Sequence, residues 1–160
     1  MNKTFQIIDI SWTQRVRPIY EESNQRYVFD AEDKMLSEKT GFYVIYGFHQ
    51  VYGPDVLLYI GETKESETSS RFFIDRLGEH FSQKFWYFEN LSYSLGTVKE
   101  SLSVKDVKAV ESILIAANRP AMNIKNIYYA KEESKDILVR NWDFKGVLAA
   151  ECSGEYWCQY

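Results

Sequence analysis

Two hydrophobic runs near the middle of the chain are separated by a turn signal. Residues 41–47 read GFYVIYG and residues 56–61 read VLLYIG, and both are rich in the β-branched and aromatic residues that favour strands. The intervening YGPD at 52–55 contains glycine, proline and aspartate, which favour turns. This pattern predicts a β-hairpin with a long loop.

An amphipathic helix is predicted after the hairpin. Phe73, Leu77 and Phe81 recur at intervals of four residues, which places them on one face of a helix. Gly78 lies inside this helix, where glycine costs about 1 kcal/mol relative to alanine. We therefore expect another group to approach closely at Gly78. The aromatic stretch 85–98 predicts a further strand.

A second helix is predicted to begin after Ser103. Asp106 follows three residues later, a spacing that resembles a capping box, and apolar residues at helical spacing continue to Pro120, which ends the helix. Residues 126–130 and 137–150 have strand-like composition. The order of strand, strand, helix, strand and helix indicates a small α+β domain with a mainly antiparallel sheet.

Length and composition indicate one globular domain. The chain has 160 residues, of which 45% are hydrophobic and 26% charged, which excludes a wholly disordered or collagen-like protein. We expect a core of residues 41–130 with an N-terminal extension, 1–40, and a C-terminal extension, 131–160, that packs on the core. The net charge of −4 excludes coating of nucleic acid by bulk charge. Only residues 101–130, with four basic and two acidic side chains, are locally positive.

The distribution of apolar residues and cysteines bears on localisation. No run approaches the 18 or more apolar residues of a membrane-spanning helix, and the N-terminal apolar run is too short for a signal peptide. Cys152 and Cys158 do not combine with His49 and His80 in a zinc-binding spacing. We therefore expect a cytoplasmic protein, without membrane contact, whose two cysteines are free thiols.

Glu111 interrupts the apolar stripe of the second helix. It lies between Val107 and Leu114 at helical spacing, where a buried carboxylate is costly unless it is neutralised, paired or bound to a metal. Two interpretations follow: Glu111 is a metal ligand, or it is a glutamate at the edge of the helix that reaches solvent.

Arg76 and His80 are four residues apart on the first helix. Their side chains share a face, where they combine a cation with a titratable base; the alternative is an ordinary solvated helix face. Arg71 is a rival arginine, but Asp75 follows it at the spacing of a helix salt bridge.

Tyr43 and Tyr59 lie on the two strands of the predicted hairpin. If the turn centres near Val51, the two tyrosines oppose each other on one face of the sheet. With 12 tyrosines in the chain, packing is the alternative explanation for such a pair.

Together these features resemble the GIY-YIG nuclease family. The first motif reads Gly41-Phe42-Tyr43, with Phe in place of the usual Ile, and the second reads Tyr59-Ile60-Gly61. The remaining matches are the helix arginine, a following His or Tyr, the metal-binding glutamate and the closing P-x-x-N element, which correspond to Arg76, His80, Glu111 and Pro120 with Asn123. The match covers about residues 41–125, and the order of its five parts is more specific than either tripeptide.

The resemblance implies a fold, a reaction and a role for each matching residue. It implies a three-stranded antiparallel sheet flanked by helices, and hydrolysis of a DNA phosphodiester with one Mg²⁺ or Mn²⁺ ion. Glu111 would hold the metal, Arg76 would bind the scissile phosphate, and Tyr43 would accept the proton of the attacking water. His80 would share that proton step. Tyr59 and Asn123 would position the phosphate or the other side chains.

DNA binding would then depend on local positive charge. The candidate cations lie beyond the second motif and in or beside the positive segment: Lys64, Lys99, Lys105, Lys108, Arg119 and Lys125. A solvated helix face is the alternative interpretation. Because no separate recognition domain is evident, we expect a small stand-alone restriction-type enzyme, or a mobile-element or phage nuclease, with a homodimer as one source of specificity.

Two other functions remain open. One is a non-catalytic nucleic-acid-binding or protein-binding module on the same fold. The other is an unrelated α+β enzyme that acts on a small molecule, although the sequence has neither a phosphate-binding glycine-rich loop nor a nucleophile elbow.

Overall fold

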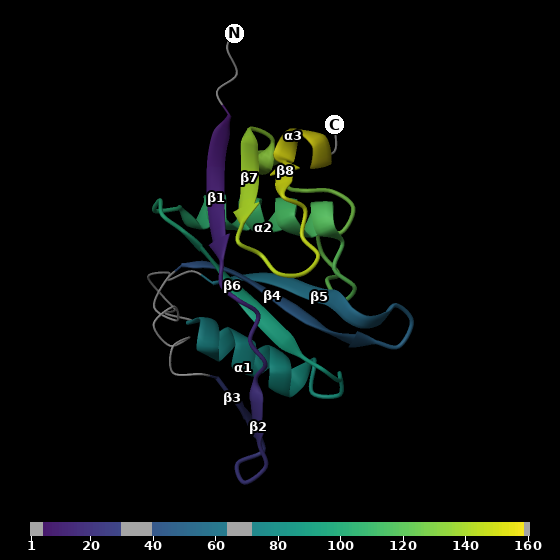
Figure 1. Ribbon diagram of the computed structural model, residues 1–160. Coiled ribbons are helices and arrows are strands. Elements are labelled where there is room, and N and C mark those ends of the chain that lie inside the picture. Colours follow the sequence, from purple (N-terminus) through teal and green to yellow (C-terminus); the bar gives the residue numbers. More distant parts are fainter. Residues whose placement is uncertain (1–4, 30–39, 64–71, 159–160) are drawn as a thin grey trace.

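The computed structural model describes residues 5–29, 40–63 and 72–158 (Figure 1). Within these residues, six strands form one mixed sheet in the order β5-β4-β6-β1-β7-β8. These strands are β1 (Gln6–Trp12), β4 (Gly41–His49), β5 (Gly53–Thr63), β6 (Ser92–Val98), β7 (Ile137–Trp142) and β8 (Glu151–Ser153). A separate hairpin consists of β2 (Ile19–Glu21) and β3 (Arg26–Val28).

Both predicted helices are present, as α1 (Phe73–Gln83) and α2 (Val104–Asn118), and the structure adds two short ones, the 3-10 helix η2 (Glu132–Ser134) and α3 (Gly154–Trp157). The predicted capping box of α2 is confirmed, because Ser103 Oγ accepts the Asp106 N–H at 3.1 Å and Asp106 Oδ2 accepts the Ser103 N–H at 3.0 Å. The helix ends at Asn118, two residues before Pro120.

The prediction of a small, mainly antiparallel three-stranded sheet is wrong. The predicted strands β4, β5 and β6 form half of the larger sheet, and β1 extends it by pairing antiparallel with β6 and parallel with β7. Of the predicted strand 137–150 only 137–142 form β7, and of 126–130 only Ala130 takes part, in a bridge to Cys158. The error arises because β1 and β7 lie at opposite ends of the chain and local sequence does not reveal their pairing. The division into a core and two extensions remains a prediction.

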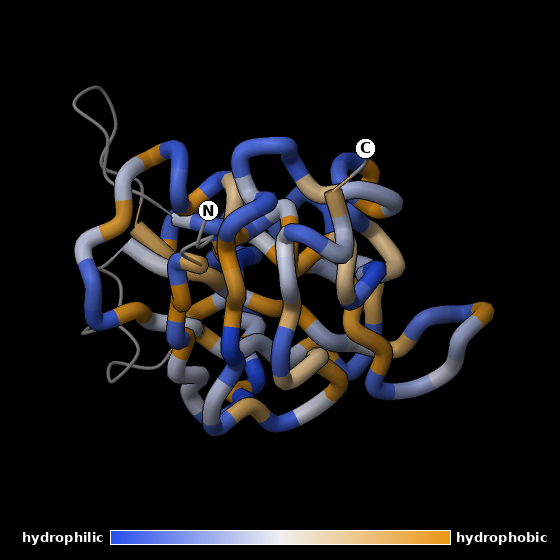
Figure 2. Tube along the Cα trace, turned by 90° about the horizontal axis from the view of Figure 1, so that it is seen from above, coloured by the Kyte–Doolittle hydropathy of each residue, from blue (hydrophilic) through white to orange (hydrophobic). Residues whose placement is uncertain are grey.

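The two longer helices pack on opposite faces of β4, β5 and β6 (Figure 1). Hydrophobic residues of α1 pack with the strand residues that point towards that helix; these include Tyr43, Ile45, Phe73, Leu77 and Phe81. Residues of α2 pack on the other face, where the sheet curls around the helix towards β7 and β8; these include Ile10, Val44, Ile60, Val110 and Ile113. Orange, hydrophobic stretches run through the interior, and many outer loops are blue (Figure 2).

Three further expectations can be compared with the structure. The expected close approach at Gly78 is wrong, because nothing lies within 4 Å of the position that a Cβ would take there. Cys152 and Cys158 are buried free thiols, as predicted. No helix among the described residues is long and apolar enough to cross a membrane.

Candidate active site

The β4–β5 hairpin places Tyr43 and Tyr59 on the face that packs against α1. The two residues do not oppose each other directly, as the sequence had suggested, because Tyr43 pairs with Gly61 and Tyr59 pairs with Ile45. They still share a face, because Tyr59 is two residues away from Gly61, the residue opposite Tyr43, and alternate residues of a strand point the same way. Their rings are nearly parallel, with centroids 6.2 Å apart.

Tyr43 is completely buried beside Gly61. A Cβ on Gly61 would lie 2.3 Å from both Cζ and Oη of Tyr43, so the absent side chain leaves the space for the phenol ring. The hydroxyl has no hydrogen-bond partner among the described residues. Burial, with a contribution from Tyr59, raises the pKa of Tyr43 well above its ordinary value of 10, so the phenol is protonated at neutral pH.

Helix α1 presents a row of three basic side chains to these tyrosines. Arg76, His80 and Lys84 follow one another at intervals of four residues and therefore lie along one side of the helix. The His80 ring lies 4.6 Å from that of Tyr59 and 5.7 Å from that of Tyr43, and Lys84 Nζ lies 5.4 Å from the Tyr59 ring centroid.

His80 is held in its neutral form. Burial, together with the nearby cations Lys84 and Arg76, lowers its pKa to about 4. Its Nε2 atom is buried and has no hydrogen-bond partner among the described residues. At neutral pH this imidazole is therefore unprotonated, and it is a weaker base than an exposed histidine.

Arg76 keeps its guanidinium at the edge of the site. Its side chain is 28% exposed and pairs with Glu79, one helical turn later, at 3.6 Å. It also interacts electrostatically with Tyr43, Tyr59 and Glu62. Arg76 therefore interacts with both tyrosines of the hairpin and with a carboxylate of β5.

Glu111 approaches β5 from α2, on the other face of the sheet. Burial and the neighbouring carboxylate of Glu62 raise its pKa to about 7, against the opposite effect of Lys131, Arg76 and Lys108. Glu62 shares the α2-facing side of β5 with Ile60, since alternate strand residues point the same way. The carboxylates therefore approach the strand from the side opposite to His80, and Arg76 interacts with both.

Asn123 fixes the outer edge of β5. Its Oδ1 accepts the Ile60 N–H at 2.9 Å and its Nδ2 donates to the Ile60 carbonyl at 3.0 Å. The Ala121 and Met122 N–H groups donate to the carbonyls of Leu57 and Leu58 at 3.0 and 2.8 Å. Residues 121–123 thus cover the strand edge, and Asn123 supports the backbone of the second tyrosine motif.

The carboxylates of Glu62 and Glu111 suit a divalent cation such as Mg²⁺. This ion prefers oxygen ligands, keeps several waters, and is commonly held by one or two carboxylates together with substrate phosphates. The Glu62 carboxylate also raises the pKa of Glu111, and a bound cation would offset this repulsion. Among the described residues, however, no three His, Cys, Asp or Glu side chains form a metal-binding group, so the fit is to a site of two carboxylates that the substrate would complete.

Apart from Lys64, the predicted DNA-binding cations lie on α2, at its C-terminal end and in the loops on either side of it. Lys108 interacts with Glu111, Lys105 and Lys125 are exposed, and Arg119 lies 5.7 Å from the ring of Trp157 in α3. Lys99 is exposed and interacts with Asp9. Lys64 lies outside the described residues, as does Arg71.

Sequence reasoning missed three charged residues of the site. Lys84 was detectable, because it continues the four-residue spacing of Arg76 and His80. Glu62 directly follows the second motif, but its approach to Glu111 depends on the packing of α2 on β5. Lys131 lies in a connecting segment, where no sequence pattern indicates its neighbour.

No protein-family model, curated protein or solved structure matches this chain. The function is therefore inferred from the geometry and chemistry of the described residues.

Proposed function

We propose that the protein is a metal-dependent DNA endonuclease that hydrolyses phosphodiester bonds. The main support is that Arg76 and Glu111, from two helices on opposite faces of the sheet, both interact electrostatically with Tyr43, the strand residue that packs against Gly61. These residues also carry the resemblance to the GIY-YIG nuclease family. Packing alone does not require a cation and a carboxylate beside a buried phenol.

Arg76 is the group proposed to bind the scissile phosphate. Its guanidinium is partly exposed and lies close to both tyrosines. A guanidinium makes paired hydrogen bonds with phosphate oxygens and stabilises the negative charge that develops on them during attack.

Glu111, assisted by Glu62, is proposed to hold Mg²⁺ or Mn²⁺. A bound ion would neutralise charge on the phosphate and stabilise the leaving oxygen. Since metal ligands must be deprotonated, a glutamate whose pKa is about 7 loads the ion more readily as the pH rises towards and above that value.

The proton chemistry is assigned to Tyr43 and His80 together. Tyr43 is protonated, so its hydroxyl orients the attacking water by hydrogen bonding. His80 is neutral and adjacent to both tyrosine rings, and we assign to it the transient uptake of the proton released by the water; its pKa of about 4 makes it a weak base that gives the proton up again at neutral pH. Tyr59 positions these groups through its ring contacts with both.

The test is a cleavage assay with purified wild-type protein and a matched pair of variants. Plasmid and phage DNA are incubated with Mg²⁺, with Mn²⁺ and with EDTA, and the products are separated on a gel. We expect metal-dependent cleavage by the wild type and by Glu133→Gln, a change at an exposed residue of η2, and none by Glu111→Gln. Cleavage by Glu111→Gln at the wild-type rate would contradict the proposal. DNA binding by a wild type that never cleaves would instead support the non-catalytic module.

A further inference from the structure

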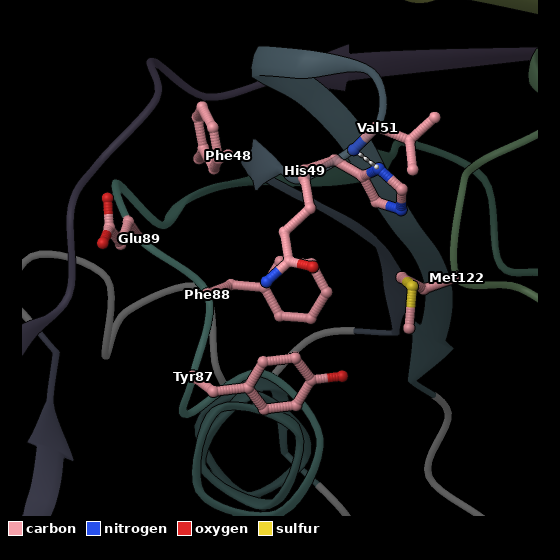
Figure 3. Close-up of a pocket in the computed structure, with 8 residues that line it drawn as sticks. Phe48, His49, Val51, Tyr87, Phe88, Glu89 and Met122 are labelled. Atoms are coloured by element: carbon pink, nitrogen blue, oxygen red, sulfur yellow. Dashed lines mark hydrogen bonds between the residues drawn. The ribbon is translucent and has the colours of Figure 1, made fainter.

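A hollow of about 350 Å³ lies next to the candidate active site but contains none of its residues. It opens between the β4–β5 turn and the loop that follows α1, with Met122 of the edge-covering segment as a third wall (Figure 3). The walls that matter here are the side chains of His49, Gln50, Tyr87, Phe88 and Met122.

Backbone and ring contacts hold these walls in place. The Phe48 N–H donates to the Glu89 carbonyl at 2.9 Å, which ties the turn to the loop. The rings of Tyr87 and Phe88 are 4.6 Å apart, and that of His49 lies 6.4 Å from Phe88. The hollow is therefore formed before any ligand arrives, which lowers the entropic cost of binding.

Aromatic contacts connect the hollow to the active site. The Phe88 ring lies 5.6 Å from that of Phe85, and Phe85 lies 5.9 Å from Tyr59 and 6.1 Å from His80. Two ring-to-ring steps thus separate the hollow from the proposed catalytic residues. A DNA strand, which rises about 3.4 Å per nucleotide, would span the distance between the hollow and these residues with a few nucleotides.

The chemistry of the walls favours a flat, uncharged ligand that accepts hydrogen bonds. His49 Nδ1 accepts the N–H groups of Val51 and Tyr52, at 3.1 and 3.3 Å, which assigns the ring proton to Nε2 as a donor. Gln50 adds an amide that both donates and accepts. Glu89 also lines the hollow, at the side of Phe88 that is away from Met122 (Figure 3). A quaternary ammonium accepts no hydrogen bond and would leave the donors of His49 and Gln50 unused, so a nucleobase fits these walls better.

We infer that this hollow binds an unpaired nucleobase of the DNA substrate, stacked on its aromatic walls. That this base belongs to a DNA strand rests on the proposed nuclease function. It narrows the substrate to DNA that has an unpaired or extruded base a few nucleotides from the scissile phosphate, because a base inside a duplex cannot enter such a hollow.

The test measures DNA binding in EDTA, so that cleavage plays no part. Three duplexes of one sequence are compared by fluorescence anisotropy: fully paired, with one unpaired adenine, and with an abasic residue in place of that adenine. We expect wild-type protein to bind the unpaired adenine about tenfold more tightly than the abasic duplex, as base stacking on aromatic side chains allows. Tyr87→Ala should abolish that ratio. Trp86→Ala, at the adjacent exposed residue outside the hollow, should preserve it.

Three results would overturn the inference. The first is equal wild-type affinity for the adenine and abasic duplexes, and the second is an equal loss in Trp86→Ala and Tyr87→Ala. The third is saturable binding of tetramethylammonium that Tyr87→Ala removes, without any base preference. A wild type that cleaves DNA but shows no preference contradicts this inference alone. One that prefers the unpaired base but cleaves nothing contradicts the nuclease function and supports the base site.

Discussion

Gly61 lies directly opposite Tyr43 in the β4–β5 register, and the tyrosine hydroxyl occupies the place where a Gly61 side chain would begin. The glycine of the second motif is therefore a steric requirement of the tyrosine of the first. The close approach places a hydroxyl that has no hydrogen-bond partner among the described residues next to a strand whose other side faces Glu111.

Gly61→Ala is expected to lower both stability and activity. The added methyl would lie 2.3 Å from the phenol of a fully buried residue, and overpacking of this kind costs about 1–3 kcal/mol. Gly78→Ala is the control, because the site is open and alanine favours the helix by about 1 kcal/mol. In urea unfolding, the free energy of unfolding should fall in Gly61→Ala and rise in Gly78→Ala. A Gly61→Ala protein as stable as the wild type would contradict this account.

Tyr43→Phe should retain the fold and lose cleavage. Removing a buried hydroxyl without a partner leaves stability unchanged or raises it by about 1 kcal/mol. Tyr46→Phe is a matched control, since Tyr46 lies on the same strand, is equally buried and has an unpartnered hydroxyl, but packs on the opposite face of the sheet. Cleavage rates should fall at least a hundredfold in Tyr43→Phe alone. Equal rates in the two variants would remove Tyr43 from the chemistry.

Arg76→Ala should reduce the cleavage rate by two to three orders of magnitude. A contact to charge that develops in the transition state is commonly worth about 3–4 kcal/mol. Single-turnover cleavage at saturating protein isolates this effect from weaker DNA binding. Arg71→Ala serves for comparison, and a larger loss in that variant would identify Arg71 as the phosphate ligand.

Glu111→Gln should stabilise the metal-free protein at high pH. In the wild type the pKa of this glutamate rises from 4.5 to about 7 on folding. Holding the ionised carboxylate in the folded protein therefore lowers the free energy of unfolding fully above pH 7 and not at all below pH 4.5. At about 1.4 kcal/mol per pH unit, the variant should be more stable at pH 8 by roughly 3 kcal/mol and no more stable at pH 4.5. Unfolding in urea with EDTA across this range measures the difference. If the difference in free energy of unfolding between variant and wild type does not change with pH, folding does not shift the pKa of Glu111.

His80 makes the opposite contribution to acid stability. Its pKa falls from 6.5 to about 4 on folding, so the stability it provides is present above pH 6.5 and is lost as the pH falls through 4. Glu111→Gln should therefore lose stability more steeply than the wild type below pH 6.5.

Added Mg²⁺ should raise the melting temperature of the wild type at pH 8 but not that of Glu111→Gln. An equal rise in both would place the metal elsewhere.

Local sequence patterns determined most of the secondary structure and named most of the candidate site. The hairpin, the hydrophobic face of α1 and the capped start of α2 follow from interactions between residues a few positions apart. Tyr43, Arg76, His80 and Glu111 were recognisable because each occupies a position at which strand or helix periodicity, or motif spacing, makes its chemistry conspicuous.

Only the tertiary structure decided how far the sheet extends and which charges meet. The parallel pairing of β1 with β7 joins the two ends of the chain, and such pairings depend on closing a long loop, for which no local pattern provides a signal. The same holds for the approach of Glu62 and Lys131 to Glu111. Burial then changed the chemistry: His80 and Glu111 have ordinary pKa values as isolated side chains, and the folded protein moves them in opposite directions because it removes water from both.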